Sequence, residues 1–396
     1  MKNIISGFGL LCALGENIAA ISENLYRQEV WPQYPKDRLE SSFAGEYPVF
    51  CIDKNIWENK KAQESFSWIF LKKALDEALI CAQIDRDSLK NMRVGVCIGT
   101  SVDASFNCFD FYRQWIKGEP NISLRPLEKY LKYSLAKEVL KYLNVSGISQ
   151  TIVTACASST DAIGIGSLWI QEDLCDIVFC GGADELSIIP YTGFIKLMVA
   201  SKNACRPFDK NRSGINLGEG AAALVLESEA NFKKRKAHKY GFVLGYGTAC
   251  DAYHLTSPAP DGRGLRRALD FAIKSAKISK DDIAFINAHG TASIDNDLVE
   301  GKVYNEILNN IPVEATKSLT GHCLGAAGAV EACLTLISLN NSKICKTKNF
   351  QEVDEKINLR PVCKDMHIDN SKAALSASLS FGGLNSVLVL GGQAYE

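Results

Sequence analysis

The chain has 396 residues, of which 46% are hydrophobic and 22% are charged, and this composition excludes an intrinsically disordered protein. Its 44 basic and 45 acidic residues leave a net charge of -1, so the chain as a whole has no bias toward nucleic acid or an anionic membrane. We therefore expect a globular protein with a full hydrophobic core, built as one large domain or two ordinary ones.

The 14 cysteines are interpreted as reduced thiols in a cytoplasmic protein, because a chain of this length does not need disulfide bonds. There is no CxxC pair, and Cys175 and Cys180 are not spaced as zinc ligands, so no metal site is predicted. Residues 1–15 include an apolar run, but Ser6 and the neighbouring glycines interrupt it, which argues against a signal peptide. No apolar run reaches about 18 residues, so no membrane insertion is expected.

The first part of the chain alternates between strand and helix patterns, which predicts an α/β layered domain. In chain order, the patterns predict a strand at 3–6, a turn at 7–9, a helix near 17–27, an irregular surface segment at 28–60, a helix at 66–79, a buried strand at 94–98 and an amphipathic helix at 127–143. The glycines at 7–9 do not complete a GxGxxG dinucleotide-binding motif, because Cys12 stands in place of the third glycine.

The stretch 151–166, TIVTACASSTDAIGIG, joins an apolar strand-like run to a bend of small residues and then to a helix. Cys156 lies on the bend. At a helix N-terminus, unpaired backbone N–H groups and the helix dipole favour the thiolate over the thiol. Cys156 is therefore a candidate nucleophile, and the alternative is a buried cysteine that serves as a small hydrophobic residue.

The pattern of this stretch occurs a second time further along the chain. Residues 153–169 and 313–337 share the order of apolar strand, small-residue turn and glycine-rich helix. Residues 218–227 and 381–390 share a tight glycine turn that leads into a buried strand. Because a repeat of this size is not a solenoid period, we infer a duplicated unit. Its N-terminal half would span 1–235 and its C-terminal half 236–396, divided at the basic stretch 233–239.

Two of the five histidines lie in turns bracketed by glycine. His289 follows a predicted buried strand at 282–287, and His322 precedes a helix that begins near Gly325. Strand ends and helix starts are the places where side chains of α/β proteins converge on a ligand. A lone histidine in a turn is usually structural, but two of them together with Cys156 indicate a catalytic set.

Several longer motifs run along the chain in a fixed order. They are TACASSTDAIG from Thr154, RPFDKNRSGINLGEGAAALVLE from Arg206, DAYHLTSPAPDG from Asp251, NAHGTASIDND from Asn287, TKSLTGHCLGAAGAVE from Thr316 and SFGGLN from Ser380. Through these motifs the chain resembles, nearly from end to end, the β-ketoacyl synthases, which are acyl-carrier-protein-dependent condensing enzymes of the thiolase superfamily. The resemblance implies a thiolase-like, duplicated, five-layered αβαβα fold.

The resemblance also implies roles for residues on the nucleophile side of the site. Cys156 would accept the acyl group, and its backbone N–H would form an oxyanion hole with that of Phe381. Phe381 matches the gating phenylalanine of the family. Thr291 and Ser293 match positions that touch the pantetheine arm of the substrate.

By the same resemblance, His289 and His322 are the two catalytic histidines, and Lys317 and Glu331 are a supporting polar pair. Neutral imidazoles would donate N–H bonds to the thioester oxygen. Lys317, close to the second histidine, would keep that ring neutral by like-charge repulsion, and Glu331 would hold Lys317. The alternative for Lys317 and Glu331 is a structural ion pair. Asp297 and Glu300 also match family positions and are interpreted as structural.

The implied reaction is a decarboxylative Claisen condensation of a Cys-bound acyl chain with malonyl-acyl carrier protein, in fatty acid, polyene or polyketide biosynthesis. No cofactor would be bound, because the carrier supplies phosphopantetheine. The protein would pair with a second copy or with a ketosynthase-like chain-length subunit. Two alternatives are a non-elongating ketosynthase or acyltransferase and a catalytically silent chain-length partner, and the joint presence of Cys156, His289 and His322 argues against the latter.

Some positions depart from the usual pattern of the family. Leu379 and Leu384 stand where FGFGGTN has a phenylalanine and a threonine, so the gate would move differently. The run from Gly193 to the buried strand at 218–227 looks closer to ketosynthases of aryl polyene or polyketide clusters. Acyl chain length and starter depend on tunnel residues outside these motifs.

Overall fold

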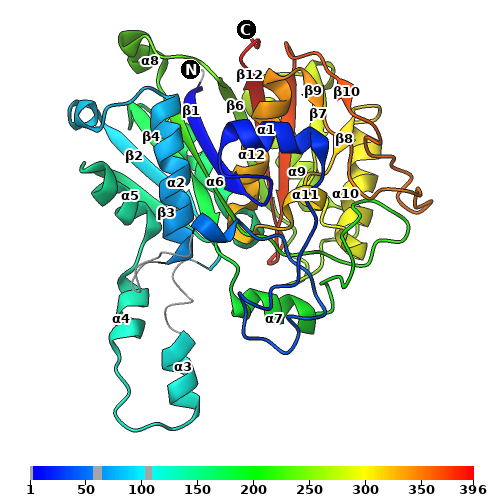
Figure 1. The fold of residues 1–396 in the computed structure, drawn as a ribbon. Coiled ribbons are helices and arrows are strands. Elements are labelled where there is room, and N and C mark those ends of the chain that lie inside the picture. Colours follow the sequence, from blue (N-terminus) through cyan, green and yellow to red (C-terminus); the bar gives the residue numbers. More distant parts are fainter. Residues whose placement is uncertain (1–2, 57–64, 103–108) are drawn as a thin grey trace.

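The computed structural model describes residues 3–56, 65–102 and 109–396, and within them the core is a ten-stranded sheet with helices on its faces (Figure 1). The strands are β1 (Asn3–Cys12), β2 (Val94–Gly99), β3 (Gly147–Ile152), β4 (Ile177–Asp184), β5 (Gly220–Glu227), β6 (Gly241–Cys250), β7 (Ile283–Asn287), β8 (Val313–Glu314), β11 (Ala373–Leu379) and β12 (Leu384–Gly392), with a separate pair β9 (Lys343–Ile344) and β10 (Met366–His367).

Helices connect these strands. They are α1 (Ile18–Arg27), α2 (Phe66–Cys81), α3 (Phe109–Ile116), α4 (Arg125–Lys132), α5 (Leu135–Leu143), α6 (Ser158–Gln171), α7 (Ile188–Lys196), α8 (Glu229–Arg235), α9 (Arg263–Ala276), α10 (Ile294–Ile307), α11 (Lys317–Thr320) and α12 (Ala327–Asn340). In the described ranges, no helix combines the length and the apolar character needed to cross a membrane.

The sheet repeats itself outward from its middle. Its order is β3-β2-β4-β5-β1-β6-β12-β11-β7-β8, and β1 and β6 pair at the centre. On each side the next two strand pairings are antiparallel and the outer two are parallel. This symmetry confirms the predicted duplicated α/β fold, while the boundary between residues 235 and 236 stays a prediction.

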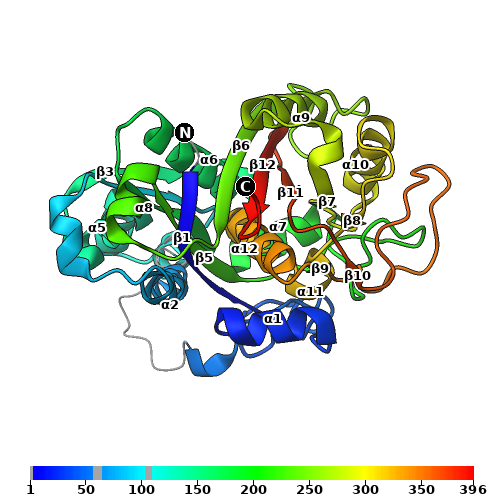
Figure 2. The same ribbon diagram turned by 90° about the horizontal axis from the view of Figure 1, so that it is seen from above.

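Helices divide the molecule into layers (Figure 2). α6 and α12 pack against each other, and each contacts strands of both halves, so together they form the middle layer. α2 covers β1 and β5 on one outer face, and α9 covers β6 and β12 on the other. α12 is buried on all sides from Ala327 to Leu339, as expected of a helix between two sheet halves. The five layers agree with the predicted αβαβα arrangement.

The predicted turn at 7–9 is wrong, because β1 continues to Cys12. The glycines there serve close packing instead. A Cβ on Gly9 would lie 1.9 Å from the carbonyl oxygen of Ala74, and a Cβ on Gly7 would lie 2.6 Å from that of Ala78. Both carbonyls belong to α2, so the missing side chains let the strand approach the helix backbone.

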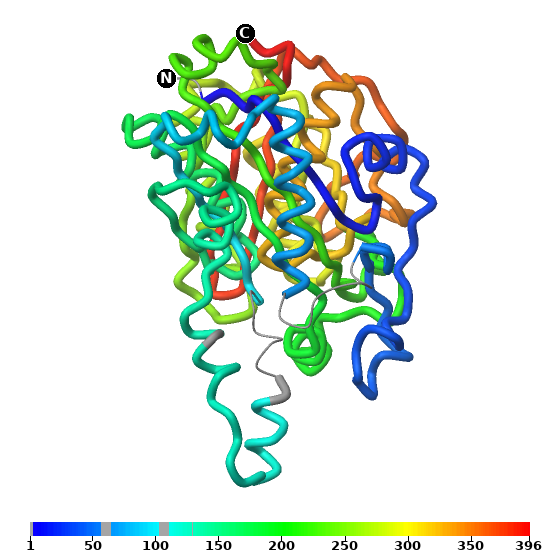
Figure 3. Tube along the Cα trace, turned by 60° about the vertical axis from the view of Figure 1, so that its left-hand side comes forward, coloured from blue at the N-terminus to red at the C-terminus, as the bar shows by residue number. Residues whose placement is uncertain are grey.

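The single helix predicted at 127–143 is divided into α4 and α5. Tyr133 is extended, and the hydroxyl of Ser134 accepts a hydrogen bond from the backbone N–H of Lys137, which starts a new helix. The hairpin formed by α3 and α4 projects from the body of the molecule (Figures 1 and 3).

The remaining early predictions agree with the structure in most places. Asn17 caps α1, the buried strand at 94–98 is β2, and the strand at 282–287 is β7. The segment 28–56 is largely irregular, as predicted, but it is anchored to the body, since Arg38 forms a buried ion pair with Glu219. Residues 57–60 of that prediction lie outside the described residues.

Candidate active site

One cavity, with a volume of about 340 Å³, brings together most of the predicted site residues. Its lining includes Cys156, His289, His322, Phe381, Thr291 and Ser293. Lys317 and Glu331 do not line the cavity and lie behind His289. The two halves of the fold therefore contribute to one site, with the cysteine from the first half and both histidines from the second.

Cys156 lies in a single 3-10 turn, Ala155–Ala157, between β3 and α6. Ala155 before it has φ 50°, a left-handed conformation that is strained for a residue with a side chain. Cys156 is 6% exposed, and burial raises the pKa of its thiol to about 11. The charge of Lys317 and the backbone N–H of Phe381 lower that pKa but do not offset the loss of water. The expected thiolate is therefore not the resting form.

The two histidine rings lie edge to face, and both line the cavity. Their ring centroids are 5.3 Å apart and the rings are nearly perpendicular, at 88°. His289 follows β7 and His322 follows α11, and each is 2% exposed. Burial lowers the pKa of both imidazoles well below the ordinary value, and the charge of Lys317 lowers both further. Both rings are neutral at physiological pH.

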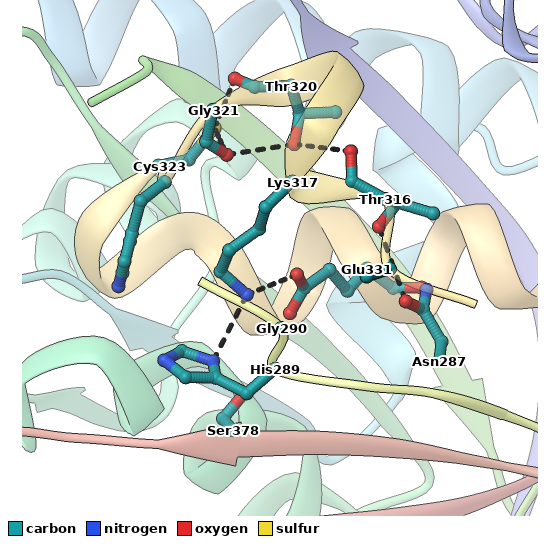
Figure 4. A network of polar contacts seen from close by, with 12 residues as sticks. Asn287, His289, Gly290, Thr316, Lys317, Thr320, Gly321, Cys323, Glu331 and Ser378 are labelled. Atoms are coloured by element: carbon teal, nitrogen blue, oxygen red, sulfur yellow. Dashed lines mark hydrogen bonds and ion pairs between the residues drawn. The ribbon is translucent and has the colours of Figure 1, made fainter. Parts of the chain in front are cut away.

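Lys317 sits between His289 and Glu331, as Figure 4 shows. Its Nζ lies 3.1 Å from Nδ1 of His289 and forms a buried ion pair with Glu331. We expected Lys317 beside the second histidine, His322; its charge does act on that ring, but the hydrogen bond is with His289. Burial raises the pKa of Glu331 to about 7, against the effect of Lys317.

Hydrogen bonds fix the same tautomer on both rings. An ammonium group only donates, so Nδ1 of His289 accepts from Lys317 and the ring proton is on Nε2. The backbone N–H of Leu324 donates to Nδ1 of His322 at 3.0 Å, which leaves the proton of that ring on Nε2 as well. The site therefore holds two neutral N–H donors suited to an oxygen that gains negative charge.

Two buried carboxylates hold the turn that carries His289. Glu300 accepts the backbone N–H groups of His289, at 2.6 Å, and Gly290, at 2.8 Å. Asp297 accepts the N–H groups of Ala292 and Phe208. These contacts are to the backbone, in line with the structural interpretation of both residues.

Phe381 lies in the turn between β11 and β12, and its ring stacks on Phe194 of α7. The ring centroids are 5.2 Å apart and the planes differ by 13°. The sequence did not single out Phe194 as a site residue, although it lies in the run that begins at Gly193, because an apolar helix does not show which of its rings will contact a distant turn. Near the same cavity, the hydroxyls of Thr291 and Ser293 are 3.0 Å apart.

No set of three or more His, Cys, Asp or Glu side chains converges as metal ligands in the part of the chain that the structure describes. The polar groups of the cavity are instead arranged around one thiol and two imidazoles. This arrangement suits acyl transfer to sulfur and stabilisation of an enolate.

Comparison with known proteins identifies the family. The model of the β-ketoacyl synthase N-terminal domain matches residues 4–231, and the model of the C-terminal domain matches residues 240–351. The chain belongs to the β-ketoacyl synthase family. The predicted family and the enzyme class, a 3-oxoacyl-[acyl-carrier-protein] synthase type of condensing enzyme, are thereby confirmed.

Full-length relatives support the same identification. The synthase is 32% identical to 3-oxoacyl-[acyl-carrier-protein] synthase 2 of Staphylococcus aureus over 401 residues, which covers 98% of this chain and 100% of the relative. A solved structure described as the ishigamide ketosynthase/chain length factor has a TM-score of 0.90 and 27% identity, with 99% of each chain covered. A type II PKS acyl-carrier protein in complex with its ketosynthase bound to the hexaketide has a TM-score of 0.88 and 25% identity, also with 99% of each chain covered. These neighbours confirm the thiolase-like ketosynthase fold.

Proposed function

We propose that this β-ketoacyl synthase condenses an acyl chain held on Cys156 with a malonyl group delivered by an acyl carrier protein. The observation that carries the proposal is that Cys156, His289 and His322 line one cavity, with Lys317 placed to control the first histidine. In this proposal the carrier supplies phosphopantetheine, Thr291 and Ser293 contact its arm, and no further cofactor takes part.

The first step is thioester exchange. The sulfur of Cys156 attacks the acyl carbonyl, the carrier leaves as a thiol, and the proton of Cys156 ends on the carrier sulfur. With a pKa of about 11 the thiol is protonated before attack, so the stabilisation must act while charge develops. The backbone N–H groups of Cys156 and Phe381 supply it as an oxyanion hole.

The second step forms the new carbon–carbon bond. The malonyl carboxylate leaves as CO2, and its electron pair becomes an enolate on the thioester oxygen. The Nε2–H groups of His289 and His322 stabilise that oxygen, each by roughly 3 kcal/mol in a dry site. The enolate carbon then attacks the acyl carbonyl on Cys156, the C–S bond breaks, and the sulfur leaves as a thiolate that takes up a proton from water.

We further propose the partners and setting of the reaction. Relatives described as a ketosynthase with its acyl-carrier protein and as a ketosynthase/chain length factor support an acyl carrier protein as substrate carrier and a homodimer or a heterodimer with a chain-length subunit. The pathway is fatty acid, polyene or polyketide biosynthesis in the cytoplasm. The relatives include both a 3-oxoacyl-[acyl-carrier-protein] synthase and a type II PKS ketosynthase, and the products of the following test distinguish these pathways.

The test is to incubate the protein with a panel of acyl-carrier proteins and malonyl-carrier protein and to identify extended products by mass. Cys156→Ala should lose the acyl adduct and all extension but keep malonyl decarboxylation. Full extension by that variant would overturn the proposal. An adduct without extension would instead identify a non-elongating ketosynthase or acyltransferase, and the absence of any adduct on the wild type would identify a silent partner subunit.

A further inference from the structure

Asp184, the last residue of β4, has a fully buried carboxylate that the proposed reaction does not use. Its oxygens accept hydrogen bonds from the hydroxyl of Thr100 at 2.5 Å and from the backbone N–H groups of residues 101–102 at 2.8 and 3.0 Å. They also accept the N–H of Gly325 at 2.6 Å. The carboxylate therefore ties the segment after β2 to the turn that follows His322.

That turn is strained. Leu324 has φ 53°, although it is not glycine, and its N–H is the group that donates to Nδ1 of His322. The next residue, Gly325, fits tightly, since a Cβ there would lie 2.6 Å from the backbone nitrogen of Ser101 and 2.8 Å from Asp184. The turn keeps its strained form only where the surroundings hold it, and Asp184 holds the peptide that follows Leu324.

We propose that Asp184 is a positioning residue for His322. Through Gly325 it keeps the Leu324 peptide aimed at Nδ1, and so keeps His322 oriented with its proton on Nε2. It acts on the enolate only through that histidine. The inference rests on the proposed function, because it concerns the step in which the malonyl group loses CO2.

The charge of Asp184 also acts on the nucleophile. It supports His322 but raises the pKa of the Cys156 thiol. The groups that act on the Cys156 thiol are Lys317, which lowers its pKa, Asp184, which raises it, and the backbone N–H groups of Phe381 and Cys156, which lower it. Burial raises the pKa of Asp184 itself to about 6, so its carboxylate is ionised at pH 8. Neutralising Asp184 should therefore lower the pKa of Cys156 while it weakens the hold on His322.

These two effects separate positioning from plain stability. The test variant is Asp184→Asn, which keeps the shape of the side chain but removes its charge. Its amide NH2 group replaces one acceptor oxygen, so backbone N–H groups that now donate to Asp184 lose their acceptor. At pH 8, CO2 release from malonyl-pantetheine should fall about tenfold or more, because small misplacements of a reacting group are costly. Alkylation of Cys156 by iodoacetamide, followed by peptide mass, should move to lower pH in the same variant.

The matched control is Glu227→Gln. Glu227 is a buried carboxylate on β5, opposite Ile177 of β4, whereas Asp184 is opposite Gly220 at the other end of the same strand pair. Both readouts should stay at the wild-type level in this control. Should Asp184→Asn fail to fold, Asp184→Glu keeps the charge on a longer arm, and it should slow CO2 release without moving the alkylation profile.

The inference is overturned if folded Asp184→Asn releases CO2 at the wild-type rate, or if both readouts only decline in proportion to the folded fraction. A wild-type protein that released no CO2 from malonyl-pantetheine would overturn the proposed function together with this inference. Wild-type activity with an unaffected Asp184→Asn would overturn this inference alone.

Discussion

Nζ of Lys317 lies 3.1 Å from Nδ1 of His289, and the same ammonium group is paired with Glu331 on its other side. One buried cation thus sets two properties of the imidazole. It donates the hydrogen bond that selects the tautomer, and its charge opposes protonation of the ring. Glu331 balances the cation, which could not otherwise lie in a water-excluded place.

Replacement of this cation is the most direct test of its role. In Lys317→Met, the proton of His289 is no longer fixed on Nε2, and the pKa of the ring rises because a like charge is gone. We expect CO2 release from the malonyl thioester to fall about hundredfold, the usual cost of a lost donor at an oxyanion. The control is Lys348→Met, which removes a buried lysine that stacks on Trp31 outside the cavity and should keep the wild-type rate.

The alkylation of Cys156 should follow its raised pKa. With a pKa of about 11, the thiolate fraction grows about tenfold for each unit between pH 8 and 10, and the rate with iodoacetamide should grow with it. Lys317→Met should move the curve to higher pH, because the attractive charge is lost. A rate that levels off near pH 8 would contradict the buried, protonated thiol; peptide mapping separates Cys156 from the other cysteines.

The stack between Phe194 and Phe381 should affect the lifetime of the acyl adduct. Aromatic pairs contribute about 0.5–1.5 kcal/mol beyond the area they bury, so Phe194→Ala should loosen the Phe381 ring that lines the cavity. We expect the adduct on Cys156 to hydrolyse about three- to tenfold faster. Intact-mass measurement over time follows the loss of the adduct. Phe194→Tyr keeps the ring and should keep the wild-type lifetime.

Glu314 should make stability depend on pH. Burial raises its pKa from an ordinary 4.5 to about 8, so between these values the folded state keeps a proton that the unfolded chain releases. The contribution of this group to the free energy of unfolding therefore decreases as pH rises from about 5 to 8, by at most about 1.4 kcal/mol per unit. The melting temperature of Glu314→Gln, relative to that of the wild type, should rise as pH increases from about 5 to 8. Above pH 8 the difference between the two melting temperatures should stay constant. Parallel curves throughout would show that Glu314 titrates normally.

The close packing of β1 against α2 should leave no room for a side chain at Gly9. Gly9→Ala places a Cβ 1.9 Å from a backbone oxygen of α2, and we expect a loss of about 3 kcal/mol in urea unfolding. Gly193→Ala is the matched control, since nothing lies within 4 Å of a Cβ there and alanine favours the helix α7. A stable Gly9→Ala protein would mean that strand and helix can separate without cost.

The sequence was most informative where one short stretch determines its own geometry. The bend around Cys156 and the glycine turns around His289 and His322 were placed correctly because their small residues leave few backbone choices. The family resemblance then supplied their common site. None of this required knowledge of distant contacts.

Features set by contacts between remote segments were predicted less well. Gly7 and Gly9 are compatible with a turn or with a close helix contact, and only the presence of α2 decides between them. The partner of Lys317 and the stack of Phe194 on Phe381 depend on how separate turns meet. The pKa of Cys156 was mispredicted for the same reason, since local N–H groups were visible in the sequence and burial was not.

The position of β12 in the sheet bears on how the chain is made. This strand comes last in the main sheet, yet it lies between β6 and β11 rather than at an edge. Until residues 384–392 have been synthesised, β6 can pair only with β1 and β11 only with β7, so each strand keeps one unpaired edge. The turn with Phe381 also lacks its second strand at that stage. The first half can assemble early, but the sheet of the second half stays open between β6 and β11, and its unpaired strand edges are exposed to chaperones until synthesis is almost complete.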